Sequence, residues 1–231
     1  HYTMNTARLT LRYAPGEKFY QMKTGRLPIN LDAPVFTLSH TWGPRCSALG
    51  NAFALSSTEA SFSKRWWFSA FGYVDVFLKG GHVWTRSPYP NLLIPNANLS
   101  YFIQLESFSC MNPMEFINDS YAQWDLTYWA NGALLNNIPL LKRLKLREAV
   151  LFRGMWGHLS HRNRPWLNRS LYTFPVQART QVMTDRPYME AGIGLDNVFR
   201  ILRIDYTWRL TYRHDPGACR GGVRFMVHLT F

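Results

Sequence analysis

Histidine, serine and aspartate side chains that lie close together in the sequence are the first candidates for chemistry. His158 and Ser160 are two residues apart, and Asp215 directly follows His214. Nucleophilic catalysis requires a nucleophile and a base within hydrogen-bond reach, and a third group that orients the base. Neighbouring side chains on a strand point to opposite faces, so adjacency in the sequence does not supply that geometry. We therefore expect no enzyme activity and assign no catalytic residue.

Metal binding is no more strongly indicated. His158 and His161 are three residues apart, but a zinc site needs further ligands in a fixed geometry, and the sequence indicates none. The three cysteines, Cys46, Cys110 and Cys219, are widely spaced, which fits neither a disulfide framework nor a zinc motif. A single bridge between two loop cysteines is an open alternative. We expect neither a metal nor a cofactor.

Residues 203–213 carry the clearest pattern, because polar and apolar side chains alternate there without a break. The apolar positions are Ile204, Tyr206, Trp208, Leu210 and Tyr212. Strand side chains point to opposite faces with period two, so the segment fits a strand. It is longer than a soluble strand of about five or six residues and suits a tilted membrane crossing of about 9–11. We predict an antiparallel transmembrane β-barrel, with these apolar side chains facing lipid.

Charged positions on this and neighbouring strands are predicted to face the barrel lumen. They are Arg203, Asp205, Arg209, Glu190 and Glu148. Charges removed from water are costly when they are unpaired, so we expect these residues to pair across strands. Such pairs either hold the wall together or shape a selective or plugged pore, and both alternatives are open.

The end of the sequence repeats the alternation. Phe225, Val227, Leu229 and Phe231 share one face of the final predicted strand. This strand has an open edge until the barrel closes, so it can pair temporarily with another protein. We predict that these four residues form the signal that the barrel-assembly machinery recognises.

The composition agrees better with a barrel than with a helical membrane protein. Aromatic residues make up 16% of the 231-residue chain, and tyrosine and tryptophan gather at membrane–water boundaries. The mean hydropathy of -0.21 is expected when apolar and lumenal polar residues alternate. No run approaches the roughly 18 apolar residues of a spanning helix.

The net charge of +12 is compatible with nucleic acid, with an anionic surface or with basic loops. The arginines are scattered along alternating strands, and no nucleic-acid recognition motif is visible. We therefore expect no nucleic-acid partner. Basic residues that face lipopolysaccharide or an acidic solute fit the barrel better.

Alternation and β-rich composition predict about nine strands. They span residues 5–13, 34–43, 51–63, 66–80, 121–131, 146–157, 188–197, 202–213 and 223–231. Closed single-chain barrels of bacteria use even numbers of strands. We therefore expect residues 1–231 to be the C-terminal part of a single barrel whose remaining strands lie upstream.

The longest link between predicted strands spans residues 81–120. Several prolines argue against regular strands in its first half, while its apolar residues argue against disorder. Loops of this length are usually functional when they are ordered. We expect this loop to fold into the lumen, or to lie outside the membrane with an added hairpin around residues 99–106.

Three segments, residues 118–132, 138–148 and 194–206, resemble the C-terminal region of a large outer-membrane family of the Bacteroidota whose function is uncharacterised. Full-length members of that family look like a signal peptide, a carboxypeptidase-regulatory-like β-sandwich and a C-terminal barrel. The resemblance implies location in the bacterial outer membrane. It also implies that the sandwich and the early barrel strands lie upstream of His1.

The same region is more distantly similar to the barrels of the outer-membrane insertase and translocase superfamily, to which BamA belongs. In that superfamily a long loop before the fifth strand from the end enters the lumen, where its arginine meets an acidic residue of the wall. Residues 81–120 hold that place here, and Arg86 would make the contact. The candidate acids are Asp125, Glu148, Glu190 and Asp205. The superfamily's Arg-Gly-aromatic loop motif is absent from residues 81–120, which puts insertase activity in doubt.

The function expected from the sequence is that of an outer-membrane β-barrel without an assigned role. Transport, translocation or insertion, and scaffolding of an envelope-protein complex are the open alternatives. Its expected partners are outer-membrane lipid, lipopolysaccharide and, during biogenesis, the barrel-assembly machinery. The rival is a soluble all-β binding module with a basic ligand surface, which would bury the alternating tyrosines and tryptophans in a protein interior.

Overall fold

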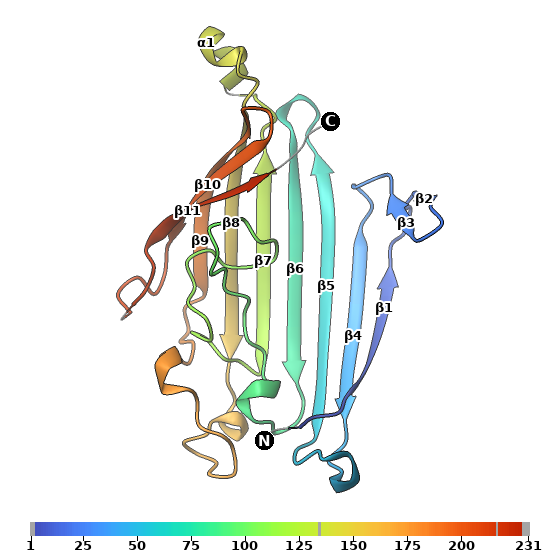
Figure 1. The fold of residues 1–231 in the computed structure, drawn as a ribbon, viewed down its shortest axis with the longest axis vertical. Coiled ribbons are helices and arrows are strands. Elements are labelled where there is room, and N and C mark those ends of the chain that lie inside the picture. The colour runs from blue at the N-terminus through green and yellow to red at the C-terminus, as the bar shows by residue number, and fades with distance from the viewer. Residues whose placement is uncertain (1–2, 134, 216, 228–231) are drawn as a thin grey trace.

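The computed structural model describes residues 3–133, 135–215 and 217–227, and strands dominate it (Figure 1). Its main sheet is antiparallel, with the strand order β1-β4-β5-β6-β7-β8-β9-β10-β11. These strands are β1 (Ala7–Tyr13), β4 (Val35–Gly43), β5 (Leu55–Trp67), β6 (Tyr73–Val83), β7 (Ser120–Trp129), β8 (Arg147–His158), β9 (Tyr188–Val198), β10 (Leu202–Arg209) and β11 (Gly221–Val227). A small separate hairpin pairs β2 (Phe19–Gln21) with β3 (Arg26–Pro28).

The helices are short and lie in the connections. They are α1 (Pro139–Lys142) and the 3₁₀ turns η1 (Ser47–Leu49), η2 (Ser69–Phe71), η3 (Tyr89–Asn91), η4 (Leu135–Asn137), η5 (His161–Asn163) and η6 (Val176–Ala178). Within the described parts of the chain, no helix is both long and apolar enough to cross a membrane.

The prediction of an all-β chain with about nine antiparallel strands is confirmed, since every strand of the main sheet overlaps a predicted strand. Among the described residues, β1 and β11 stand at the two ends of the strand order. Consecutive strands of the sheet are neighbours throughout, apart from the excursion into the β2–β3 hairpin. This meander is the simplest antiparallel topology, because each connection joins adjacent strands.

The turn between β5 and β6 was placed wrongly by the sequence pattern. We expected residues 64–65 to form this turn, but β5 continues to Trp67 and β6 begins at Tyr73. Phe68 N–H donates to the Gly72 carbonyl at 2.8 Å. Gly72 has a φ of 89°, and a Cβ there would lie 1.9 Å from the Trp129 carbonyl oxygen. Only glycine fits so close a backbone approach, which fixes the turn at this position.

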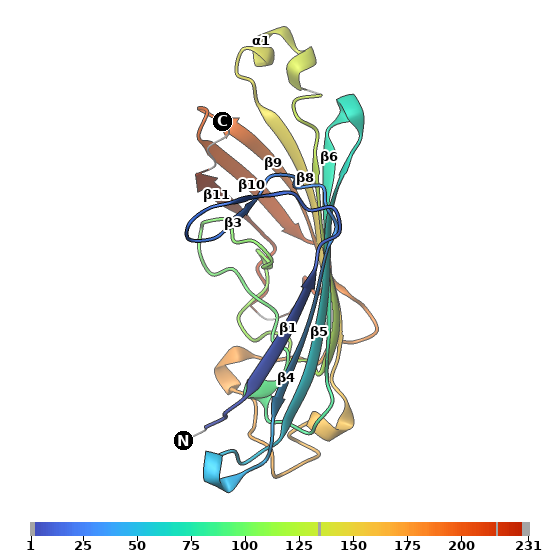
Figure 2. The ribbon, with the colours of Figure 1, turned by 90° about the vertical axis from the view of Figure 1, so that its right-hand side faces the viewer.

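The sheet curves, and residues 84–119, the long loop, lie on its concave side (Figure 2). The loop follows β6 and returns to β7 at the same end of the sheet (Figure 1). Its residues 99–106 do not add a hairpin. Instead, Phe102 forms an isolated parallel bridge with Phe225 of β11. The loop therefore crosses the concave face and reaches the β11 edge.

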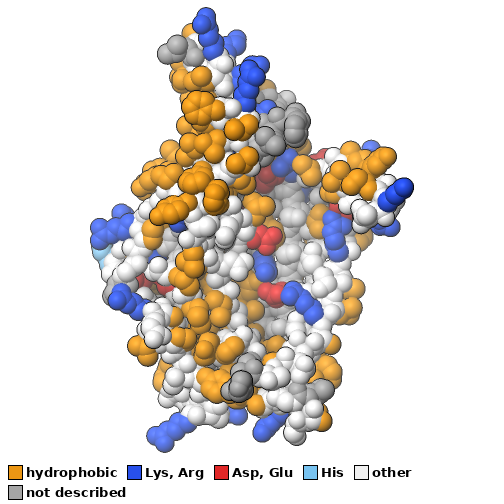
Figure 3. Space-filling model, viewed as in Figure 1, with side chains coloured by type: hydrophobic (Ala, Val, Ile, Leu, Met, Phe, Trp, Pro, Cys, Tyr) orange, Lys and Arg blue, Asp and Glu red, His pale blue; other side chains and the backbone are white. Residues whose placement is uncertain are grey.

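The convex face of the sheet is apolar and exposed, and the concave face is charged and buried, which is the reverse of a typical soluble sheet. Large apolar side chains on the convex face are exposed, among them Leu38, Val150, Phe152, Trp156, Ile193, Tyr206 and Trp208. Charged side chains on the concave face of β8, β9 and β10 are buried. Acidic and basic side chains are visible in the hollow of that face (Figure 3). The polar side of the sheet is therefore the inner side.

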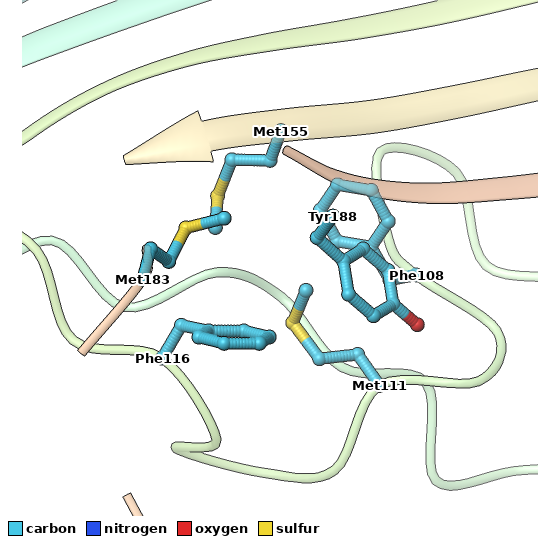
Figure 4. Packing of buried hydrophobic residues seen from close by; sticks show 6 residues of the cluster. All are labelled: Phe108, Met111, Phe116, Met155, Met183 and Tyr188. Atoms are coloured by element: carbon cyan, nitrogen blue, oxygen red, sulfur yellow. The ribbon is translucent and has the colours of Figure 1, made fainter. Parts of the chain in front are cut away.

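The apolar core lies between the concave face and the loops. One cluster joins Phe108, Met111 and Phe116 of the long loop to Met155 of β8, Met183 and Tyr188 (Figure 4). A second cluster contains Leu55, Val83, Leu92, Ile117 and Leu159. Both clusters include residues of the long loop, so burial of apolar surface holds that loop against the sheet.

Candidate functional site

Four charged side chains of alternating sign stand in register across the concave face. Asp125 of β7 pairs with Arg153 of β8, Arg153 with Glu190 of β9, and Glu190 with Arg209 of β10. We call these four residues the charge row. Directly opposed residues of antiparallel strands share a face, so each charge has an opposite charge beside it. Glu190, Arg153 and Arg209 are buried, which makes this pairing essential.

Glu190 holds the backbone of the long loop. Its two carboxylate oxygens accept hydrogen bonds from the N–H groups of Cys110, at 2.7 Å, and Ser109, at 2.9 Å. Tyr188 O–H donates to the same carboxylate at 2.6 Å. A carboxylate that accepts several N–H and O–H groups has most of its lost hydration replaced. The buried Glu190 carboxylate thus obtains hydrogen-bond donors from the loop backbone, and the loop N–H groups obtain an acceptor.

Arg209 holds the loop through a side chain. Its Nη2 and Nη1 atoms lie 2.5 and 3.1 Å from the two carboxylate oxygens of Glu115, in a bidentate pair. The guanidinium also donates to the Cys110 carbonyl and lies 4.9 Å from the ring centroid of Tyr188. Arginine suits this position because its planar fork matches a carboxylate and stacks on an aromatic ring.

Arg153 adds a third attachment. Its Nε atom lies 2.8 Å from a carboxylate oxygen of Asp125, and its Nη1 donates to the Ser107 carbonyl at 3.2 Å. Three residues of the charge row, Arg153, Glu190 and Arg209, therefore form hydrogen bonds or ion pairs with residues 107–115. The hydrogen-bonding groups of the charge row are occupied by loop atoms, so this arrangement holds the loop and does not form an open ligand site.

A separate buried ion pair lies closer to the other end of β10. Arg203 donates to both carboxylate oxygens of Asp205, at 2.8 and 2.7 Å, and its guanidinium lies 4.5 Å from a Trp129 ring centroid. Gly194 faces this pair from β9, and a Cβ there would lie 2.3 Å from an Asp205 oxygen. The glycine makes room for the carboxylate, as a glycine on the polar side of a strand allows.

The hollow beside the loop forms a pocket of about 400 Å³ between the β2–β3 hairpin and the charged wall. Its charged lining residues include Arg65, Asp75, Asp125, Arg153 and Arg203. Arg65 and Asp75 already form a bidentate pair, at 2.6 and 2.9 Å. A pocket whose charges are paired suits water and small polar solutes better than a tightly held ion.

Asp119 ties the end of the long loop to residues 159–187. Its carboxylate accepts hydrogen bonds from Ser160 N–H at 3.0 Å, from Asn163 Nδ2 at 2.9 Å and from the Ser160 hydroxyl. Burial of the carboxylate tends to raise its pKa, but these hydrogen bonds outweigh burial, and the pKa of Asp119 is lower than usual. The charged form of Asp119 is therefore the one that the fold stabilises.

Three predicted site residues occupy places that differ from the expected ones. The Arg86 side chain is exposed, and the ion pair between loop and wall joins Glu115 to Arg209 instead. The loop thus supplies the acid and the wall supplies the arginine. Our expectation had these roles reversed, because the loop acid carries no periodic signal in the sequence.

Glu148 lies on the convex side of β8, although we expected it in the lumen. It shares a face with Val150, while Ala149 and Arg153 point inward. Its carboxylate accepts the N–H groups of Gly132, at 2.8 Å, and of Leu135. The strand starts with two charged residues, so alternation alone could not decide which of them faces inward.

The convex face of β10 holds most of the residues that we assigned to lipid. Tyr206 is 38% exposed, Trp208 41% and Leu210 43%, and Ile204 is half-buried on the same face. Tyr212 is different. The strand ends at Arg209, and Tyr212 has a φ of 54° and packs against Phe116 on the inner side.

The predicted assembly signal is described only in part, because Leu229 and Phe231 lie outside the described residues. Phe225 pairs with Ile204, and Val227 with Leu202, so both side chains point to the convex face. The Phe225 backbone also pairs with the loop, since its N–H donates to the Tyr101 carbonyl at 2.9 Å. The β11 edge is therefore partly covered by the loop.

No group of three histidine, cysteine, aspartate or glutamate side chains in the described parts of the chain is arranged to hold a metal ion. His158 is half-exposed and lies 3.9 Å from Asp119, and His82 Nδ1 lies 2.7 Å from the Ser120 hydroxyl. The other ring nitrogen of His82 faces an arginine, Arg162, at 3.4 Å.

Comparison with known proteins gives a family but no activity. The family of unknown function DUF5686, C-terminal domain, matches residues 1–162. The match includes Glu115 of the long loop and Arg153 of the charge row, whereas Glu190 and Arg209 lie beyond it. No curated protein matches the chain. Because the match covers more than half of its length, the chain belongs to the DUF5686 C-terminal domain family.

Proposed function

We propose that this chain forms the C-terminal part of the wall of an outer-membrane β-barrel, and that the long loop plugs the interior of that barrel. The observation that carries the proposal is the inversion of the two faces. The sheet exposes its large apolar side chains on the convex face and buries its ion pairs on the concave face. A soluble sheet does the reverse.

The convex face has the character of a lipid contact. An exposed Val, Leu, Ile, Phe or Met side chain forgoes roughly 1.5–3 kcal/mol relative to full burial in an apolar environment. Many such side chains cover adjacent strands, from Leu38 of β4 to Trp208 of β10. Large continuous apolar surfaces mark contacts with membranes or proteins. The length of the strands, up to 13 residues in β5, favours the membrane.

The concave face has the character of a plugged lumen. Barrel interiors are polar and are either filled with water or closed by a loop or helix. Here the charge row and two apolar clusters hold the long loop against the wall. These contacts close the interior, so transport or translocation through this barrel would require the loop to move.

The proposal also names the surroundings of the chain. Outer-membrane lipid and lipopolysaccharide would cover the convex face, and upstream strands would complete the wall between β1 and β11. The barrel-assembly machinery would act during insertion at the β11 edge before the long loop docks there, because backbone groups of an open edge accept an added strand. Other envelope proteins are candidate partners, and nucleic acid is not.

The test uses the full-length protein, fractionated from cells and then reconstituted in lipid bilayers. We expect it in the outer-membrane fraction, extractable only with detergent. The Glu115→Gln variant should conduct ions more than the wild type, because it leaves Arg209 without its partner and loosens the loop. Glu106→Gln, an exposed position of the same loop, is the matched control and should behave as the wild type.

Two results would contradict the proposal. Extraction without detergent would remove the lipid contact and favour a soluble binding module. Equal conductance of Glu115→Gln and the wild type, with stable co-purification of other envelope proteins, would favour a scaffold. Folding of each variant is checked by its shift in gel mobility on heating.

A further inference from the structure

Two of the three cysteines lie where the long loop meets residues 210–220, the loop that connects β10 to β11. Cys110 belongs to the long loop and is 1% exposed, whereas Cys219 is half-buried in the connection before β11. Their sulfur atoms approach carbonyls of adjacent strands. Cys110 Sγ lies 3.6 Å from the Thr207 carbonyl, and Cys219 Sγ lies 3.5 Å from that of Gly221.

The two segments run side by side in opposite directions at this point. Asn112 Nδ2 donates to the Gly217 carbonyl at 3.1 Å. On the other side of the cysteines, Arg224 Nη2 donates to the Ser109 carbonyl at 2.7 Å. Two residues back from Asn112 along the loop is Cys110, and two residues on from Gly217 is Cys219. The cysteines therefore lie between these two contacts, and their thiols are close enough for Cys219 to influence the pKa of Cys110.

Cys110 is also held in place by the charge row. Its N–H donates to Glu190 and its carbonyl accepts from Arg209. Burial, the Glu190 charge and the neighbouring Cys219 thiol, in that order, raise the pKa of the Cys110 thiol. Cys219 is the more exposed thiol of the pair, so an external disulfide reaches it first.

We infer that Cys110 and Cys219 form a disulfide bond that fastens the long loop to the wall of the barrel. The inference rests on the proposed function, because the cell envelope outside the cytoplasm is where structural disulfides form and persist. The bond would join the plug to the β10–β11 connection beside Glu190 and Arg209. The bond would hold Cys110 against the wall while residues around Glu115 remain free to move, so only complete release of the loop would require its reduction.

The oxidant is a small-molecule disulfide or the active-site disulfide of a thiol oxidoreductase. The Cys219 thiolate attacks one sulfur of that disulfide, forms a mixed disulfide and expels the first thiol. Cys110 loses its proton and attacks Cys219 Sγ, which forms the Cys110–Cys219 bond and expels the second thiol. Two protein thiols become one disulfide, and the donor disulfide is reduced to two thiols.

The experiment counts free thiols in the full-length protein, purified from membranes without reductant and unfolded in the presence of a maleimide. Peptide mapping locates the adducts on Cys46, Cys110 and Cys219, and only these three cysteines are counted. We expect one adduct, on Cys46, before reduction and three after it. The unreduced digest should contain a peptide that links Cys110 to Cys219.

Matched variants separate this bond from other pairings. Cys46→Ser should leave no adduct before reduction, whereas Cys110→Ser and Cys219→Ser should each leave two. Three adducts in the unreduced wild type, or a linked peptide that contains Cys46, would overturn the inference. Incubation of the reduced protein with oxidised glutathione tests whether Cys110 and Cys219 are close enough to form a bond, whatever compartment the protein occupies in the cell. If Cys110 and Cys219 do not link there either, the inference fails even if the barrel proposal stands.

Discussion

At the scale of single residues, the pair between Glu115 and Arg209 is the contact on which the seating of the loop depends most. Both side chains are almost fully buried. Removal of one partner of a buried ion pair leaves an uncompensated charge and costs about 3–5 kcal/mol. We expect Glu115→Gln to lower the free energy of unfolding by about 3 kcal/mol, measured by urea titration in lipid vesicles.

The control for this loss is the exposed pair of Arg12 and Glu17. Their atoms are as close, at 2.6 Å, but solvent screens the pair, so Glu17→Gln should leave the urea midpoint unchanged. A loss in Glu17→Gln equal to that in Glu115→Gln would show that burial at the charge row is unimportant.

Gly194 gives a second prediction at this scale. An alanine there would force the Asp205 carboxylate away from Arg203, and overpacking of this kind costs about 1–3 kcal/mol. Gly80→Ala is the matched control, because the nearest atom to its Cβ would be the Tyr121 carbonyl oxygen at 3.4 Å. The two variants are compared by urea titration. Equal midpoints would mean that Asp205 relaxes without loss.

Asp119 makes a prediction about pH. Its pKa is lower in the folded protein than the ordinary value, which is about 3.9 in unfolded chains. Its stabilising contribution is therefore complete above the unfolded value and is lost as the pH falls through the lower folded value. His158 lies 3.9 Å from Asp119, and histidine changes charge between about pH 5 and 8, so both proteins carry His158→Gln. The protein with Asp119 should then exceed Asp119→Asn in stability by a constant amount from pH 7 to about pH 5, and the difference should shrink below about pH 4. A difference independent of pH would contradict this origin.

In the interior of a strand, the sequence pattern predicts which face of the sheet a residue occupies, whereas at a strand end, as for Glu148, and in loops it does not. Arg203, Asp205, Arg209 and Glu190 sit on regular strands, where period two assigns a face directly. Glu115 was missed because loops have no period and its partner is distant in the sequence. The register that aligns the charge row depends on turn lengths, which alternation does not determine.

At the scale of elements, the strands were readily predicted and their ends were not. Alternation marks the interior of a strand, whereas the end depends on where a backbone turn fits. Gly72 fixes the start of β6. Strand β10 ends at Arg209, three residues before the positive φ of Tyr212. The β2–β3 hairpin was not predicted, since strands of three residues are too short to show a period.

The convex face of β10 yields a prediction for this scale. A charged residue on the lipid face of a barrel costs about 2–4 kcal/mol at the membrane centre. We expect Trp208→Arg to reduce folding into lipid vesicles, measured by the fraction that shows a heat-dependent shift in gel mobility. Phe199→Arg, at an 88% exposed turn position, should fold as the wild type does. Normal folding of Trp208→Arg would place that side chain in water.

At the scale of the whole molecule, the curved sheet, the inverted faces and the docked loop have one explanation. A curved sheet with lipid outside needs a polar interior, and a polar interior wide enough to admit water can be closed by a loop. In the proposed barrel, the edges at β1 and β11 would belong to a longer wall. Alternation predicted the antiparallel sheet and its approximate number of strands, while the contacts that hold the loop required the structure.

The most direct test of this account is the accessibility of nitroxide labels along β10 in the full-length protein, reconstituted in lipid. Single cysteines replace Tyr206, Trp208 and, as an inner-face control, Thr207, in a background without the native cysteines. Labels at Tyr206→Cys and Trp208→Cys should collide often with oxygen, which dissolves in lipid, and rarely with a water-soluble nickel complex. The label at Thr207→Cys should be shielded from oxygen. Frequent nickel collisions at the two aromatic positions, or protection of both from oxygen and nickel alike, would contradict lipid contact.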